Sequence, residues 1–210
     1  MTFKKTRKLL QCGAVAATLA VLAPGALAQS GDIKIGAFAA MSGAAAAQGK
    51  SLLEGVELAV KAKNAAGGIN GRKIQIVVGD DAGKPEEAAV VARRFATRDG
   101  VTLAIGSVSS PASLAAAQVF REEEVPQIVT SATAQRITTQ GNQWVFRSAV
   151  PDRKFVADIV DFLNEKFPKL KRFGFIFVND DFGKGGLDSF VEAGKKYGMK
   201  IGRASCRERV

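Results

Sequence analysis

The feature that most constrains the fold is the regular alternation of short apolar runs with helical patterns along residues 33–197. The apolar runs are nearly continuous, as in strands that are buried on both faces. We expect strands at 33–38, 73–79, 101–106, 125–130, 144–147 and 173–178, and helices at 49–66, 85–98, 110–124, 152–167 and 186–197. Strands that alternate with helices form a parallel sheet with helices on both faces. The sequence therefore predicts an α/β fold of the doubly wound kind.

The N-terminus has three regions in a characteristic order. Residues 4–8 carry four cations and no acid, an apolar run follows over 9–22, and the small-residue site Ala26-Leu27-Ala28 comes after it. This order is typical of a secretory signal peptide. The apolar run is shorter than the ~20 residues that span a membrane. We therefore expect residues 1–28 to be a cleaved signal peptide and the mature protein to be periplasmic.

Composition argues against two classes of function. The net charge of +10 falls to +4 over residues 29–200, once the four cations of the leader and the net +2 of the last ten residues are removed. A modest excess spread along the chain is typical of a solvated surface, so we expect no nucleic-acid partner. The chain has no histidine, which removes Ser–His–Asp triads, histidine-based zinc sites and the commonest general base. We expect a protein that is not an enzyme and that needs no cofactor.

Three motifs partly match sites for phosphate or metal. Residues 44–51 (AAAAQGKS) follow a strand and open a helix like a P-loop, but Ala44 stands where that motif needs glycine. Asp80 and Asp81, after the next strand, resemble the carboxylates of a magnesium site in such enzymes. Residues 180–183 (DDFG) lack the remaining ligands of a calcium loop. We therefore expect neither nucleotide hydrolysis nor a metal site.

Hydroxyl-bearing loops after two successive strands are the best candidates for a binding site, because ligands of such sheets bind beyond the carboxyl ends of the strands. Ser109 and Ser110 lie at a helix start, where capping alone would explain them. The free N–H groups and the helix dipole there also attract an anion such as a carboxylate. Ser131 and Thr133 bring hydroxyls and carbonyls to the same edge, so the two loops can take both ends of a zwitterion. Spacing does not decide between capping and binding.

Eight short motifs in a fixed order are the most specific feature of residues 31–200. They are IKIG at 33–36, MSG at 41–43, GVELA at 55–59, NAAGGINGRK at 64–73, DD at 80–81, AIG at 104–106, VFR at 145–147 and DFG at 181–183. This series resembles the leucine/isoleucine/valine-binding proteins, which are type I periplasmic binding proteins of ABC importers. The resemblance implies two doubly wound lobes that close on a hinge of crossing strands around a ligand and then dock on a permease.

The same resemblance implies roles for individual residues. Ser110 would hold the α-carboxylate of an amino-acid-like ligand through its hydroxyl and N–H. The carbonyl of Ser131 and the hydroxyl of Thr133 would take the α-ammonium. Phe182 matches a tyrosine that usually lines the pocket from the second lobe, and Gln48 replaces a frequent tyrosine in the first loop. The acid that balances the ammonium is expected beyond residue 200.

The expected domains are a signal peptide at 1–28, an N-terminal lobe at 29–148, a partial C-terminal lobe at 149–200 and a non-native tail at 201–210. The tail reads IGRASCRERV, continues no periodic pattern and resembles the translation of a sequencing adapter. Cys206 lies in it, and the one other cysteine, Cys12, lies in the leader. We therefore expect no disulfide in the body of the protein and an incomplete second lobe.

The resemblance predicts an extracytoplasmic solute-binding protein, a monomer, that captures branched-chain or related amino acids for an ABC importer. Its expected partners are an amino-acid-like small molecule and an ABC permease in the inner membrane. Two alternatives stay open. One is a ligand-binding sensory domain of the same fold, and the other is a receptor for amides, urea or aromatic acids, which the same family also includes.

Overall fold

The structure is a computed structural model that describes the backbone of residues 31–206 and the side chains of residues 31–202. The predicted signal peptide at 1–28 lies outside the described residues, as do residues 207–210. From Asp32 onward the described residues belong to one compact unit. They contain two parallel sheets, and we call each sheet with its helices a lobe.

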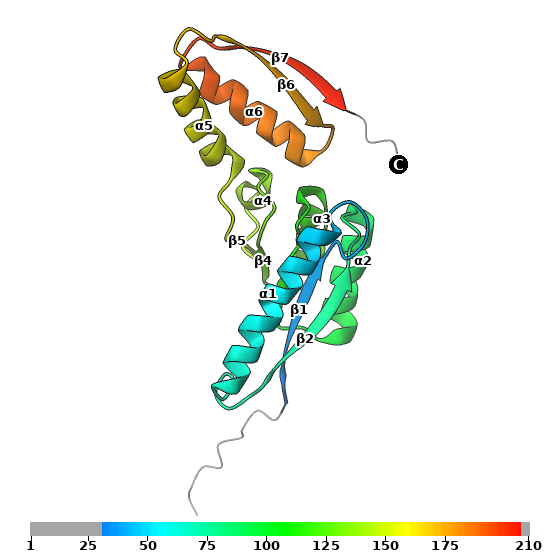
Figure 1. Cartoon of the computed structure of the whole chain (residues 1–210). Coiled ribbons are helices and arrows are strands. Elements are labelled where there is room, and N and C mark those ends of the chain that lie inside the picture. Colours follow the sequence, from blue (N-terminus) through cyan, green and yellow to red (C-terminus); the bar gives the residue numbers. More distant parts are fainter. Residues whose placement is uncertain (1–30, 207–210) are drawn as a thin grey trace, which may run out of the picture. The chain divides into compact units, whose positions relative to one another are not determined.

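The sheet of the first lobe has five parallel strands in the order β2-β1-β3-β4-β5. Figure 1 labels β1, β2, β4 and β5 of this sheet. The strands are β1 (Ile33–Ala39), β2 (Ile74–Asp80), β3 (Leu103–Ile105), β4 (Gln127–Val129) and β5 (Val145–Arg147). The order reverses at β1, where Gly36 pairs with Val77 of β2 on one side and with Ala104 of β3 on the other. Such a reversal opens a crevice at the carboxyl ends of the strands, where doubly wound sheets bind ligands.

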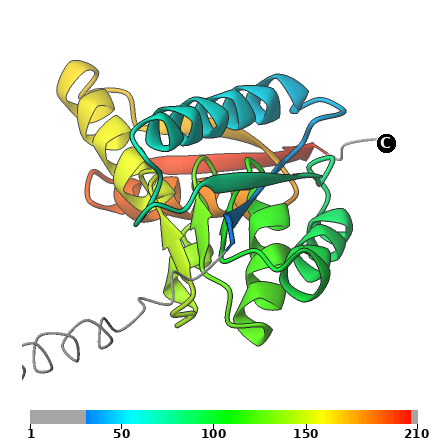
Figure 2. The same ribbon diagram turned by 90° about the horizontal axis from the view of Figure 1, so that it is seen from below.

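Helices cover both faces of this sheet. They are α1 (Ala46–Ala65), α2 (Pro85–Arg94), which continues as the π-helical turn η1 (Phe95–Asp99), and α3 (Ser110–Glu122). The side chain of Phe38 meets the rings of Phe95 and Phe120 edge to face, and all three rings are fully buried. α2, η1 and α3 therefore pack on the face that carries Phe38, and α1 lies on the opposite face (Figure 2). This arrangement confirms the predicted doubly wound α/β class.

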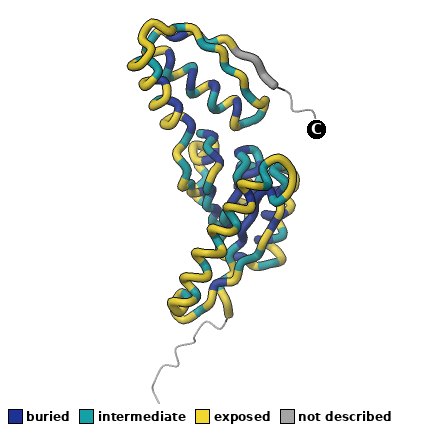
Figure 3. The backbone as a smooth tube through the Cα atoms, in the orientation of Figure 1, coloured by how far each residue is buried: buried dark blue, intermediate teal, exposed yellow. Residues whose placement is uncertain are grey.

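The sheet face beneath α1 is thinly covered. Gly49 is the buried residue of this helix, and the Leu58 side chain is 69% exposed. Figure 3 shows the same exposure along α1. Between α1 and the sheet lies an apolar groove of about 990 Å³, lined in part by Ile35, Leu52 and Val56. We call it the α1 groove. The apolar positions of this helix thus face an open groove instead of a closed core.

The second lobe has two parallel strands among the described residues, β6 (Arg172–Val178) and β7 (Lys200–Cys206). The helices α5 (Asp152–Lys166) and α6 (Asp181–Lys195) pack together beside them. The ring of Phe190 lies 5.6 Å from that of Phe173 and 5.5 Å from that of Phe175, centre to centre, at the middle of this small core. Ile176, on the other face of β6, is 75% exposed. Residues 148–151 connect the two lobes. The domain boundaries proposed from sequence stay predictions.

β7 contains residues from the segment expected to be a non-native tail. Its backbone pairs with β6 in a continuous parallel register from Lys200 to Cys206. Backbone pairing does not test where the native sequence ends, because a strand ladder uses main-chain groups common to all residues. The expectation for residues 201–210 therefore stays a prediction.

The predicted start of α6 is wrong. The sequence placed residues 179–186 in a loop, whereas α6 begins at Asp181. Asp180 caps this helix, because its Oδ1 accepts a hydrogen bond from the amide of Gly183 at 2.8 Å. A Cβ on Gly183 would lie 2.0 Å from the carbonyl oxygen of Val178, so the glycine is needed for a close approach to β6. Glycines lower helix propensity, and for that reason the sequence predicted a later start for this helix.

Candidate functional site

In the loop after β3, the neighbouring residues Ser109 and Ser110 make different contacts. Ser109 is the N-cap of α3, and its Oγ accepts a hydrogen bond from the amide of Ala112 at 3.5 Å. Ser110 is only 3% exposed, and its Oγ accepts from the amide of Ala134 at 3.3 Å. A hydroxyl that accepts one bond still has its own hydrogen to donate. The amide of Ser110 opens α3 and so has no acceptor within the helix. Capping by Ser109 therefore leaves Ser110 with two donors at the helix start.

The loop after β4 is tied to the first one through the bond from Ala134 to Ser110. Within it, the carbonyl oxygen of Thr133 accepts from the amide of Asp152 at 3.0 Å and from Nη1 of Arg147 at 3.1 Å. These contacts fix the backbone beside the Thr133 hydroxyl. Ser131, two residues before Thr133, is exposed. The loop thus presents one hydroxyl on a fixed backbone and one exposed residue at its edge.

A cavity of about 280 Å³ lies where these two loops meet the start of α6. We call it the interlobe cavity. It is lined by Val108, Ser109, Ser110, Pro111, Ser131, Ala132, Thr133, Asp180 and Phe182. Ligand pockets in proteins usually measure roughly 300–1,000 Å³. The cavity lies just below this range and suits a small solute. The side chain of Phe182 is 50% exposed and forms the aromatic part of the wall.

Five of the six residues singled out from sequence line this cavity, namely Ser109, Ser110, Ser131, Thr133 and Phe182. The sixth, Gln48, lines the α1 groove instead. The reason is that α1 starts at Ala46, so Gln48 lies in the first turn of a helix and not in the loop before it. Ser131 lines both the groove and the cavity.

Asp180 is a cavity residue that sequence reasoning missed. The pattern of residues 180–183 assigned it to helix capping, and Oδ1 does cap Gly183. The structure also places Asp180 in the wall of the interlobe cavity, two residues before Phe182. A carboxylate in this wall can balance a positive charge on a ligand. The available signal was its position directly after β6, at the carboxyl end of a parallel strand.

Two polar side chains, Gln127 and the half-buried Arg147, hold the loops in place. The sequence analysis did not single out Gln127, and it noted Arg147 only as part of the VFR motif. Gln127 is fully buried, and its Nε2 donates to the carbonyl oxygens of Gly106 at 3.1 Å and Ser113 at 3.4 Å. Arg147 donates from Nη1 to the carbonyl oxygen of Ala134 at 2.8 Å, besides its bond to Thr133. Burial lowers the pKa of Arg147 from its ordinary value, and the charge of Asp152 opposes that change. Through these bonds to carbonyl oxygens, both side chains fix the backbone next to the two loops that line the cavity.

Asp80 and Asp81 do not line the interlobe cavity and instead organise the neighbouring loops. The carboxylate of Asp80 accepts from the amides of Met41 and Ala82, each at 2.8 Å. Burial raises the pKa of Asp80, but the hydrogen bonds from Met41, Ala82 and Ser42 together outweigh it and leave that pKa below its ordinary value. Asp81 is fully buried, and burial raises its pKa against the opposing effects of the Ser107 hydroxyl and the Gly83 amide.

Among residues 31–202, whose side chains the structure describes, no group of three or more histidine, cysteine, aspartate or glutamate side chains is placed to hold a metal ion. No helix in the same part is long and apolar enough to cross a membrane.

Comparison with known proteins identifies close relatives. Residues 32–205 match the family model described as periplasmic binding protein. The Leu/Ile/Val-binding protein of Escherichia coli strain K12 is 34% identical over 172 residues, which is 82% of this chain and 46% of that protein. The Leu/Ile/Val-binding protein homolog 7 of Brucella abortus is 38% identical over 159 residues, which is 75% of this chain and 40% of that protein.

Solved structures show the same fold. A branched-chain amino acid transporter substrate-binding protein from Streptococcus pneumoniae, in complex with isoleucine, is 32% identical with a TM-score of 0.74, over 83% of this chain and 49% of that one. A leucine-binding protein from Thermotoga maritima is 26% identical with a TM-score of 0.76, over the same shares. The chain thus spans about half the length of the relatives that it matches. The matched family model, the identities and the shared two-lobe α/β fold together show that this chain belongs to the periplasmic binding protein family.

Proposed function

We propose that the chain is part of an extracytoplasmic solute-binding protein that captures branched-chain or related amino acids for an ABC importer. The observation that carries the proposal is the interlobe cavity, in which donors, acceptors and an aromatic ring meet in a volume of about 280 Å³. The E. coli relative is a Leu/Ile/Val-binding protein, and the S. pneumoniae relative is in complex with isoleucine, which supports this ligand class.

The donor side of the cavity suits an α-carboxylate. The hydroxyl of Ser110 and its amide both sit at the N-terminus of α3, a helix of 13 residues. The partial positive charge of a helix N-terminus favours an anion there. Hydrogen bonds to a charged acceptor are roughly twice as strong as neutral ones. Ser110 is therefore the proposed anchor of the ligand carboxylate.

The acceptor side suits an α-ammonium. The proposed contacts are the carbonyl of Ser131, the hydroxyl of Thr133 and the carboxylate of Asp180, all of which line the cavity. Asp180 makes the cavity favour a zwitterion over a simple carboxylic acid, because an uncompensated carboxylate beside a second carboxylate is repelled. Phe182 covers the site from the second lobe and excludes water, which strengthens the polar contacts beneath it.

In the proposal, these residues bind the ligand and catalyse no reaction. The cavity wall holds hydroxyls, a carboxylate and apolar groups, and the chain has no histidine to act as a general base. Export through residues 1–28 places the protein outside the cytoplasm, where the proposed permease partner would receive the loaded form. We propose that it acts as a monomer.

Calorimetry on the complete protein, encoded by the full gene and without residues 1–28, tests the ligand class. The matched probes are L-leucine, 4-methylpentanoate, which lacks the ammonium, and L-leucinamide, which lacks the carboxylate. We expect L-leucine, L-isoleucine or L-valine to bind, and both leucine analogues to bind at least about tenfold more weakly, because each lacks a charged group that pairs with one side of the site. Tighter binding of benzoate than of every amino acid would favour the aromatic-acid alternative.

A further inference from the structure

One ion pair joins the two lobes next to the interlobe cavity. Nη1 of Arg136, in the short helix α4 (Arg136–Thr139), lies 2.5 Å from Oδ1 of Asp181, the first residue of α6. α4 follows β4 and belongs to the first lobe, whereas α6 belongs to the second. The Asp181 side chain is 31% exposed, so the pair is partly shielded from water on one side.

The guanidinium of Arg136 is also held within its own lobe. With the amide of Gln140 oriented so that its oxygen faces Arg136, this oxygen accepts from Nη2 at 3.1 Å and from Nε at 3.3 Å. Nη1 is left to reach across to Asp181. A long side chain held in this way loses less conformational entropy when it pairs, because part of its freedom is already lost.

The pair stands beside cavity residues on both lobes. Arg136 lies three residues after Thr133, and Asp181 lies between Asp180 and Phe182. A rigid movement of one lobe away from the other would break this pair and would also carry Phe182 and Asp180 away from the loop that contains Thr133. Attraction between the two charges favours the arrangement in which the cavity has both of its walls.

We propose that the Arg136–Asp181 ion pair is an electrostatic latch that stabilises the ligand-competent approach of the two lobes. Arg136 and Asp181 are then positioning residues, which raise ligand affinity without contact with the ligand. The apparent dissociation constant equals the intrinsic one divided by the competent fraction, so a latch that raises this fraction tightens binding. The expected change in ligand affinity rests on the proposed function. The expected change in the distance between the lobes rests on the ion pair alone.

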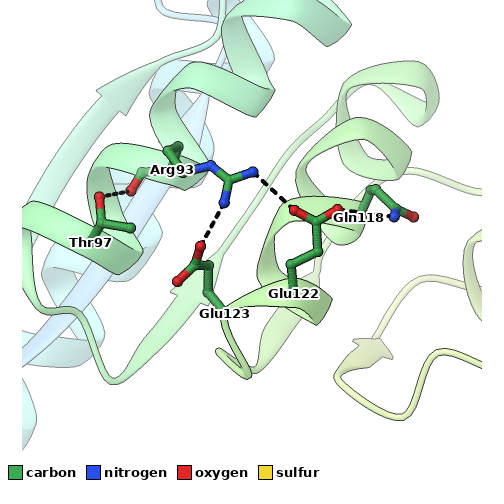
Figure 4. Close-up of polar contacts among 5 residues, drawn as sticks. All are labelled: Arg93, Thr97, Gln118, Glu122 and Glu123. Carbon is green, nitrogen blue, oxygen red and sulfur yellow. Dashed lines mark hydrogen bonds and ion pairs between the residues drawn. The ribbon is translucent and has the colours of Figure 1, made fainter.

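A second ion pair supplies a control within one lobe. Arg93 of α2 donates to Glu122 at 2.9 Å and to Glu123 at 2.5 Å, at the end of α3 (Figure 4). The Arg93 side chain is 49% exposed, against 65% for Arg136. Both helices lie in the first lobe. Arg93→Ala therefore removes exposed ion pairs that do not join the two lobes.

The first experiment measures the affinity of the complete protein for L-isoleucine by calorimetry at two salt concentrations. Arg136→Ala is expected to weaken binding about three- to fivefold at low salt, the upper range for a partly exposed pair. Raising ionic strength from about 0.01 M to about 1 M shortens the Debye length from ~30 to ~3 Å, so the wild type should approach the variant. Exchange of the charges, Arg136→Asp with Asp181→Arg, should restore part of the affinity, and Arg93→Ala should leave it unchanged.

The second experiment needs no ligand. Spin labels at Lys61→Cys in the first lobe and Lys169→Cys in the second, both exposed positions, report the distance between the lobes by double electron–electron resonance. Arg136→Ala should lower the population with the shorter distance, and Arg93→Ala should not. If L-isoleucine and the other probes fail to bind the wild type, the proposed function fails, but this distance still tests the latch. An unchanged affinity and distance in Arg136→Ala, or equal changes in Arg93→Ala, would overturn the latch.

Discussion

Replacing Ser110 with alanine separates the ligand-binding and structural roles of one hydroxyl. Its oxygen accepts from the amide of Ala134 at 3.3 Å, and both residues are buried. An unpaired buried amide costs about 1–3 kcal/mol, so Ser110→Ala should lower the free energy of unfolding by that amount. The ligand carboxylate also loses a charge-assisted donor, worth about 1.5–3 kcal/mol. Calorimetry with L-isoleucine should therefore show roughly ten- to a hundredfold weaker binding.

Ser113→Ala is the matched control. Ser113 is fully buried, and its Oγ donates to the carbonyl oxygen of Ser107 and accepts from the amide of Ser107, each at 3.4 Å. It lies in the same helix turn as Ser110 but does not line the cavity. Urea unfolding should show a similar loss of stability of about 1–3 kcal/mol, while the affinity for L-isoleucine stays unchanged. Wild-type affinity in Ser110→Ala, or an equal loss of affinity in Ser113→Ala, would refute the assigned role of Ser110.

Three other substitutions, one of them a control, test the packing and the electrostatics. Gly183→Ala places a Cβ 2.0 Å from the carbonyl oxygen of Val178 and should lower the free energy of unfolding by about 1–3 kcal/mol. Gly186→Ala, whose Cβ would meet only Phe175 at 3.9 Å, should raise it by about 0.5–1 kcal/mol in the same urea titration; equal effects would contradict the close approach at Gly183. For Asp81, burial raises the folded-state pKa above 3.8, so the wild type loses stability as pH rises through 3.8 to that higher value. Asp81→Asn should remove this loss, and a stability difference between the two proteins that does not grow with pH would contradict the assignment.

The sheet was predictable because apolar runs near the right length mark strands that are buried on both faces. The sequence did not indicate that α1 would face an open groove. Leu52 and Leu58 read as apolar helix positions whether or not another element covers them, and Leu58 is 69% exposed. Local pattern reports which residues can be buried, whereas the neighbours present in the structure decide which ones are.

The location of the loops that line the interlobe cavity was predictable where it depended on strand ends. Parallel strands bring their carboxyl ends to one edge, which is why Ser110 and Thr133 line the same cavity. Gln48 was placed in a loop because its helix was expected to start three residues later than it does. Asp180 was missed because capping alone explained it, and its place in the cavity wall depends on how α6 meets the first lobe. Such contacts between distant segments leave no trace in local spacing.

A crystal structure of the complete protein with L-isoleucine tests the central claim most directly. We expect the α-carboxylate within about 2.7–3.2 Å of both the hydroxyl and the amide of Ser110. We expect the ammonium to face Thr133 and Asp180, with Phe182 covering the ligand from the second lobe. A ligand bound in the α1 groove beside Gln48, or a carboxylate that makes no contact with Ser110, would contradict the account.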